Sequence, residues 1–207
     1  ILPEPRNILH SIIHEKTEVL LFLLGKGKYH ILDALVFRAY PGRKLAAFLQ
    51  EHCQDLLGKS DVKEELYQDL MTSKAIHDAV ECGRLDVLQF FINLFDEYDQ
   101  EKIVDLFTQP DENDNYPVKL AAKVGHLKII EFLEQNGISL KQIDKFENNA
   151  LHSAAARGHN ETIKYLLNVL DINSRTKTGE TPLYLAVKKR HTHTVTLLIE
   201  NNASIGP

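Results

Sequence analysis

The chain has 207 residues, of which 43% are hydrophobic and 26% are charged, a balance typical of a folded soluble protein. No run of eighteen apolar residues occurs, so the sequence excludes a membrane-spanning helix. Two cysteines are too few for a disulfide framework, and no signal peptide is visible. We therefore expect a monomeric protein of the reducing cytoplasm.

The formal net charge of −5 is unevenly distributed along the chain. Residues 71–115 hold 3 basic and 11 acidic residues, a net charge of −8. Residues 116–207 hold 12 basic and 8 acidic residues, a net charge of +4. An acidic middle beside a basic end favours a protein-binding surface that steers its partner, and it argues against a general affinity for nucleic acid.

Residues 1–70 are predicted to be helical, with an imperfect pattern. Apolar residues cluster at 8–13, 20–24, 31–35 and 45–49, and a further short helix is expected over 60–70. The first twelve residues resemble the opening helix of an F-box through Leu2, Pro3, Glu4, Ile8, Leu9 and Ile12. That resemblance implies docking on a ubiquitin-ligase adaptor, although Pro5 interrupts the motif and no second F-box helix is recognisable. An ordinary capping helix is the alternative.

A repeated pattern begins at residue 72. The stretches 116–126, 149–159 and 181–191 align in phase, because Val118, Leu151 and Leu183 are separated by 33 and 32 residues. Each stretch is followed by an apolar cluster with helical spacing. An upstream copy starts at Lys74, so the chain contains four copies, over 72–95, 114–140, 147–172 and 179–205.

This pattern resembles the ankyrin repeat, with its T-P-L-H start and its period of 33 residues. The resemblance implies an all-α solenoid of stacked helix-turn-helix units, with four clear copies and one or two degenerate copies in residues 1–70. Gly83, Gly125 and Gly158 stand where a first helix must end, and Thr181 can cap the next one. In this family the histidines at 77, 152 and 159 brace helix and loop by hydrogen bonds, a better account than metal binding.

The spacing between the copies at Ile76 and Val118 is nine residues longer than 33. The added segment, 96–112, is acidic and contains an amphipathic stretch over 103–107. We expect an extended or additional helix here, capped by Asp99. Simple structural variation and a projecting acidic contact surface are the two interpretations of this insertion.

The sequence predicts no catalytic residues, no cofactor and no metal site. Gly25-Lys26-Gly27-Lys28 lacks the spacing of a phosphate-binding loop and is better explained as a turn that ends a helix. His10 and His14 lie one helical turn apart, but no third ligand accompanies them.

The ankyrin resemblance implies that a partner protein lies along the concave face, against the turn tips and the ends of the first helices. From residue 116 onward the residues at these positions are mostly basic, which predicts an acidic partner segment. The predicted partner-binding residues are Asn115, Lys123, Lys145, Phe146, Arg157, Lys177, Thr178, Lys188 and Lys189.

Three wider interpretations accompany this one. The first is that the chain is a ubiquitin-ligase adaptor with an F-box-like start. The second is that it is the substrate-recruiting part of a larger enzyme. The third is an effector of an intracellular bacterium, because F-box segments precede ankyrin arrays in some such effectors. No polar cap follows the last apolar cluster, so we expect either a continuing chain or an exposed last helix.

Overall fold

The computed structural model describes residues 64, 67–68, 70–71, 74–95 and 100–205. The F-box-like start, His10, His14 and the proposed Asp99 cap lie outside these residues, as do nearly all of the N-terminal helices expected over 1–70. Within the described part of the chain every regular element is a helix and none is a strand, which confirms the all-α class. None of these helices has the length and apolarity needed to cross a bilayer.

The chain forms two compact units, Ile1–Ile103 and Val104–Pro207. In the first unit, α7 (Ala75–Glu81) packs against α8 (Leu85–Leu94), and the turn between them passes through Gly83 with φ of 71°. The apolar faces of both helices are buried, as the sequence pattern predicts. Helix α9 (Gln100–Thr108) lies in the predicted insertion and crosses the boundary between the two units.

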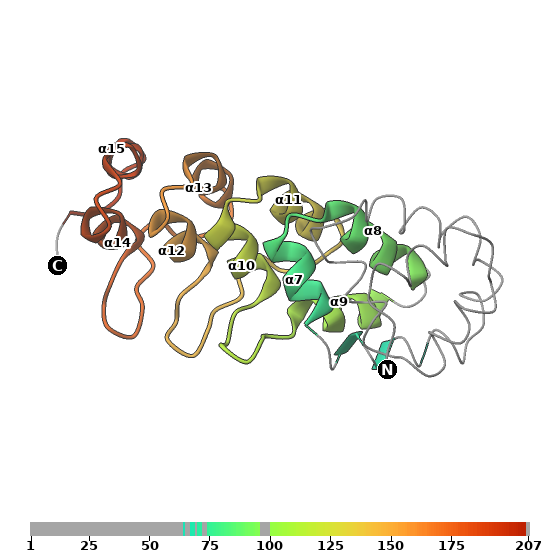
Figure 1. Cartoon of the computed structure of the whole chain (residues 1–207). Helices are drawn as coiled ribbons and strands as arrows, with labels where there is room; N and C mark the ends of the chain where they lie inside the picture. Colours follow the sequence, from blue (N-terminus) through green and yellow to red (C-terminus); the bar gives the residue numbers. More distant parts are fainter. Residues whose placement is uncertain (1–63, 65–66, 69, 72–73, 96–99, 206–207) are drawn as a thin grey trace, which may run out of the picture. The chain divides into compact units, whose positions relative to one another are not determined.

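The second unit contains three helix pairs in two parallel rows (Figure 1). The first helices of the pairs contact one another in the order α10, α12, α14, and the second helices in the order α11, α13, α15. Long loops connect each pair to the next and project from the row of first helices (Figure 1). The bounds are α10 Pro117–Val124, α11 Leu127–Gln135, α12 Ala150–Ala155, α13 Asn160–Leu166, α14 Pro182–Lys188 and α15 Thr192–Glu200.

The first helices of the second unit begin with proline in the first turn, with a side-chain cap, or with both. Pro117 and Pro182 stand in the first turn, where a missing N–H costs nothing. The Thr181 hydroxyl accepts a hydrogen bond from the Tyr184 N–H at 3.1 Å, which confirms the predicted cap. In α12 the Asn149 side chain takes the same role and accepts from the His152 N–H at 3.1 Å.

Glycine and histidine together fix the spacing of neighbouring pairs. Gly125 ends α10 with φ of 80°, and a Cβ on it would lie 2.5 Å from the Nδ1 atom of His159 in the next pair. That ring is held in place because its Nε2 donates to the Lys123 carbonyl oxygen at 3.0 Å. His191 repeats the arrangement against Gly158 and bonds the Ala156 carbonyl oxygen at 3.2 Å. The predicted bracing role is therefore confirmed for His159.

Gly125→Ala and Gly179→Ala separate the backbone cost from the packing cost. Both glycines have a positive φ, but a Cβ at Gly179 would meet nothing within 4 Å. We expect Gly179→Ala to lower the free energy of unfolding by about 1 kcal/mol, the usual cost of a left-handed alanine. Gly125→Ala should cost about 1–3 kcal/mol more, because the His159 ring must move. Urea unfolding midpoints measure both, and equal costs would contradict the close approach.

Candidate functional site

Three turns with the same geometry form the tips of the projecting loops. We call them finger 1 (111–115), finger 2 (144–148) and finger 3 (176–180). In each, the first N–H donates to the fifth carbonyl oxygen and the fourth N–H donates to the first carbonyl oxygen, at 2.8–3.0 Å. The fourth residue has a positive φ, and it is Asp114, Glu147 or Gly179. Each finger is therefore a defined turn with a fixed backbone.

The first side chain of each finger holds the turn closed. Asp111 Oδ1 and Asp144 Oδ1 each accept the N–H of the fifth residue at 2.8 Å, and the Thr176 hydroxyl does so at 3.1 Å. Short Asp and Thr side chains commonly bond the backbone of a turn in this way. The predicted site residue Asn115 belongs to this arrangement, since its side-chain Nδ2 donates to both carboxylate oxygens of Asp111.

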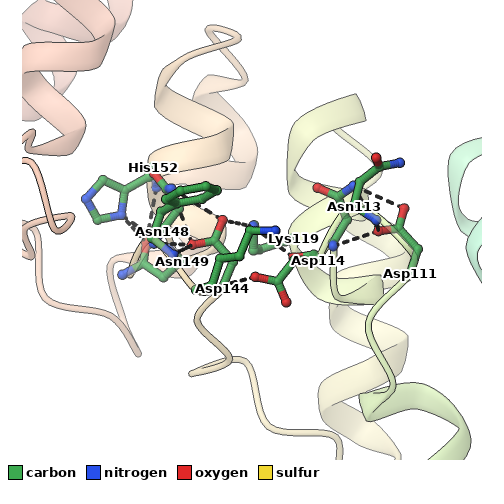
Figure 2. Close-up of polar contacts among 11 residues, drawn as sticks. Asp111, Asn113, Asp114, Lys119, Asp144, Asn148, Asn149 and His152 are labelled. Carbon is green, nitrogen blue, oxygen red and sulfur yellow. Dashed lines mark hydrogen bonds and ion pairs between the residues drawn. The ribbon is translucent and has the colours of Figure 1, made fainter.

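A buried ion pair joins α10 to finger 2 (Figure 2). Lys119 stands at the position that His152 occupies in the next copy, and its Nζ bonds Asp144 Oδ2. The two side chains are only 6% and 9% exposed. The same Nζ lies 3.5 Å from the carbonyl oxygen of Asp114, so this lysine touches two successive fingers. Sequence analysis missed this contact, although a lysine in a histidine position was a visible signal.

The pKa of Asp144 lies below its usual value, although burial of the carboxyl acts to raise it. The opposing causes are the hydrogen bond and charge of Lys119, together with backbone hydrogen bonds from Asn148 and Phe146. These donors favour the ionised form of the carboxyl. Asp144 is therefore charged at neutral pH and compensates the buried ammonium of Lys119.

Neighbouring fingers are also tied to one another at their tips. The Lys145 N–H donates to Asp114 Oδ2 at 2.5 Å, which links finger 2 to finger 1. The Lys177 N–H donates to the Phe146 carbonyl oxygen at 2.9 Å, which links finger 3 to finger 2. The backbone of residues 145–146 is therefore held from both sides.

Phe146 projects from the tip of finger 2 with 56% of its surface exposed. The sequence left open whether this ring was tucked into the adjacent turn or exposed, and the structure shows it exposed. The Lys145 ammonium lies 5.3 Å from the ring centroid, a cation–π distance. Lys145 and Lys177 are themselves exposed.

The other predicted partner-binding residues differ in how far their side chains are exposed. Arg157, Thr178, Lys188 and Lys189 are exposed, whereas Asn115 and Lys123 are half-buried. Lys188 forms an ion pair with Glu180 at 2.7 Å, which raises the pKa of the lysine. Its charge is therefore partly neutralised within the chain.

His152 has a structural role. Its Nε2 donates to the Ser174 carbonyl oxygen at 3.1 Å, and its Nδ1 accepts the Asn149 N–H at 3.3 Å. Burial lowers the pKa of His152 against the opposing effect of its carbonyl contacts, so the ring is neutral at pH 7. No group of three potential metal ligands occurs within the described ranges.

The outer side of α14 carries an exposed apolar group that the sequence analysis did not predict. Tyr184, Val187 and Ile205 are 51%, 55% and 78% exposed, and they line an open hollow of about 650 Å³. Ala122 and Ala155, which occupy the position of Val187 in the two preceding repeats, are fully buried. This hollow thus lies on the side of α14 that corresponds to an interface between repeats.

Comparison with known proteins identifies the repeat. Residues 118–207 match the family model for ankyrin repeats, in three copies. These residues are therefore ankyrin repeats, and repeats of this family are generally non-catalytic protein-interaction modules.

Two relatives are much longer than this chain. A transient receptor potential cation channel subfamily A member 1 homolog of Caenorhabditis elegans is 30% identical over 45% of this chain. Alpha-latrotoxin-Lg1a of Latrodectus geometricus is 32% identical over 54% of this chain. In both cases the match spans only 8% of the relative's length.

A third relative matches this chain over most of the length of both proteins. The probable 26S proteasome regulatory subunit p28 of Saccharomyces cerevisiae is 26% identical over 93% of this chain and 78% of its own length. None of these three relatives is bacterial, so they do not support the interpretation as a bacterial effector.

A double-mutant cycle tests the ion pair. We expect Asp144→Asn to lower the free energy of unfolding by about 3–5 kcal/mol, because it leaves the Lys119 ammonium buried without its partner. Lys119→Met should cost less, because Asp144 keeps its backbone N–H donors. Denaturant unfolding of both single variants and the double variant gives the coupling energy. A coupling below about 0.5 kcal/mol would contradict a direct interaction.

The lowered pKa of Asp144 also predicts how stability depends on pH. The pKa of Asp144 in the folded chain lies below the unfolded value of about 3.9. The carboxylate therefore makes its full contribution to the free energy of unfolding above that pH. It is lost as pH falls through the folded pKa. The stability difference between the wild type and Asp144→Asn should therefore shrink when urea unfolding is measured at pH 3 in place of pH 7. A constant difference would show that Asp144 is not the titrating group.

Proposed function

We propose that the chain binds an acidic segment of a partner protein through its finger surface. We define this surface as fingers 1–3 together with the C-terminal ends of α10, α12 and α14. The ankyrin repeats over 118–207 support a role in protein interaction. The acidic character of the partner and the exact residues are inferred from geometry and charge.

The exposed ring of Phe146 carries this proposal. A protein in water gains nothing by exposing an aromatic ring on a rigid turn, whereas buried aromatic anchors dominate the energy of many interfaces. Lys145 and Lys177 place ammonium groups on finger 2 and on the adjoining finger 3. An apolar side chain flanked by carboxylates would satisfy this arrangement.

The basic ends of α12 and α14 favour the same partner, whereas finger 1 is acidic through Asp111, Glu112 and Asp114. Arg157, Lys189 and Arg190 are exposed at the ends of α12 and α14. Lys188 is paired with Glu180, so we assign it a smaller share than Lys145 or Lys177. Complementary charge mainly accelerates association and makes the binding sensitive to salt. Asn115, Lys123 and Thr178 complete the proposed contact set.

The yeast relative favours a second candidate function, that of a non-catalytic subunit in a larger assembly. It is named a proteasome regulatory subunit, and it matches nearly the whole of this chain. This candidate is close to the ubiquitin-ligase adaptor interpretation, whose F-box-like residues lie outside the described ranges. Gel filtration of cell extract separates the subunit candidate from the binder of an acidic segment. A stable subunit migrates with a large particle, whereas a transient binder migrates as a cytoplasmic monomer.

Two variants test the finger surface against a panel of peptides in which a central leucine or phenylalanine is flanked by glutamates. Lys145→Glu with Lys177→Glu should weaken binding about tenfold or more and flatten its dependence on salt. Phe146→Ala should weaken binding about tenfold, since hot-spot truncations commonly cost more than 1 kcal/mol. Isothermal titration calorimetry measures both effects.

Lys128→Glu is the matched control, because it makes the same kind of charge reversal at an exposed site on α11, away from the fingers. Equal losses in Lys128→Glu and in the finger variants would show a nonspecific charge effect. Unchanged affinity in both finger variants would exclude the finger surface.

A further inference from the structure

Finger 2 is fixed more firmly than its exposed position requires. Asp144 Oδ1 accepts the N–H groups of Phe146 and Asn148, both at 2.8 Å, from inside the finger. The Lys177 N–H bonds the Phe146 carbonyl oxygen from finger 3. Finger 1 holds the tip through the Lys145 N–H, which donates to Asp114 Oδ2.

Asp114 occupies a backbone conformation that glycine adopts more readily. Its φ of 63° lies in the left-handed region, which costs a side-chain-bearing residue about 1–2 kcal/mol relative to an extended or right-handed helical conformation. The equivalent residue of finger 3 is Gly179, which has no such cost. The equivalent residue of finger 2 is Glu147, whose φ is also 63°. Asp114 differs from both in that its carboxylate accepts the backbone N–H of Lys145.

We propose that Asp114 is a positioning residue for binding, which holds the Lys145–Phe146 tip in the orientation that engages a partner. The inference rests on the proposed function of the finger surface, and it adds a residue whose role does not require contact with the partner. A tip already held in its bound conformation loses less conformational freedom on binding, so affinity rises without a new contact. The carboxylate acts through the Lys145 backbone and leaves the lysine side chain free for the partner.

Asp114→Gly and Glu147→Gly form a matched pair that isolates this role. Each variant removes one negative charge and relieves one positive φ at the same position of adjacent fingers. They differ in that only Asp114→Gly removes the acceptor of the Lys145 N–H. Loss of a negative charge by itself should strengthen the binding of an acidic peptide, so weaker binding by Asp114→Gly has the opposite sign to the electrostatic effect.

Amide hydrogen exchange in the free protein gives the first measurement. We expect the Lys145 amide to exchange about tenfold faster in Asp114→Gly than in Glu147→Gly or the wild type, with unchanged unfolding midpoints or higher ones. Asp114→Asn should restore slow exchange, because an amide oxygen can accept the same N–H and asparagine tolerates the left-handed region. Equal exchange rates in the two glycine variants would overturn the inference, whether or not any peptide binds.

Affinity for the glutamate-flanked peptides gives the second measurement. Asp114→Gly should bind about three- to tenfold more weakly than Glu147→Gly, the range expected for one newly mobile segment. Equal affinity of the two variants would overturn the positioning role even if exchange differs. Absence of peptide binding in the wild type would instead contradict the proposed function, and the exchange comparison would still decide whether Asp114 fixes the tip.

Discussion

The close approach of the first helices is the constraint on which the rest of the second unit depends. Ala121, Ala154 and Ala186 are fully buried along the row of α10, α12 and α14. A larger side chain at these positions would force the helices apart, because packed cores do not absorb added volume without strain. The spacing of the helices sets the spacing of the loops, so small residues inside the array determine whether adjacent fingers can bond tip to tip.

Local chemistry explains why much of this architecture could be predicted from the sequence. The prolines in the first turn and the positive φ of the glycines are local features, and the period of 32–33 residues is visible in the order of the residues alone. The packing of Gly125 and Gly158 against histidine rings does depend on the next repeat. The bracing role of His159 was predicted through the family resemblance, and its acceptor on Lys123 became visible only in the structure.

The polar network between fingers could not be predicted in the same way. Lys119 and Asp144 are 25 residues apart, and Asp114 and Lys145 are 31 residues apart. Several other acidic residues in the sequence were equally plausible partners for Lys119. The charge count favoured a basic surface, but it could not show that Lys188 is paired with Glu180 while the Phe146 ring is exposed.

The contacts of His159 and His191 with the preceding pair run in one direction along the chain. His159 donates to the carbonyl oxygen of Lys123, and His191 donates to that of Ala156, so the later repeat supplies the donor each time. The tip bonds from Lys145 and Lys177 run the same way. For these four contacts, a chain made from its N-terminus onward presents the acceptor before the donor is synthesised. The bonds from Lys119 to Asp144 and from His152 to Ser174 run the other way, so a repeat has all of its polar partners only when the following repeat is present.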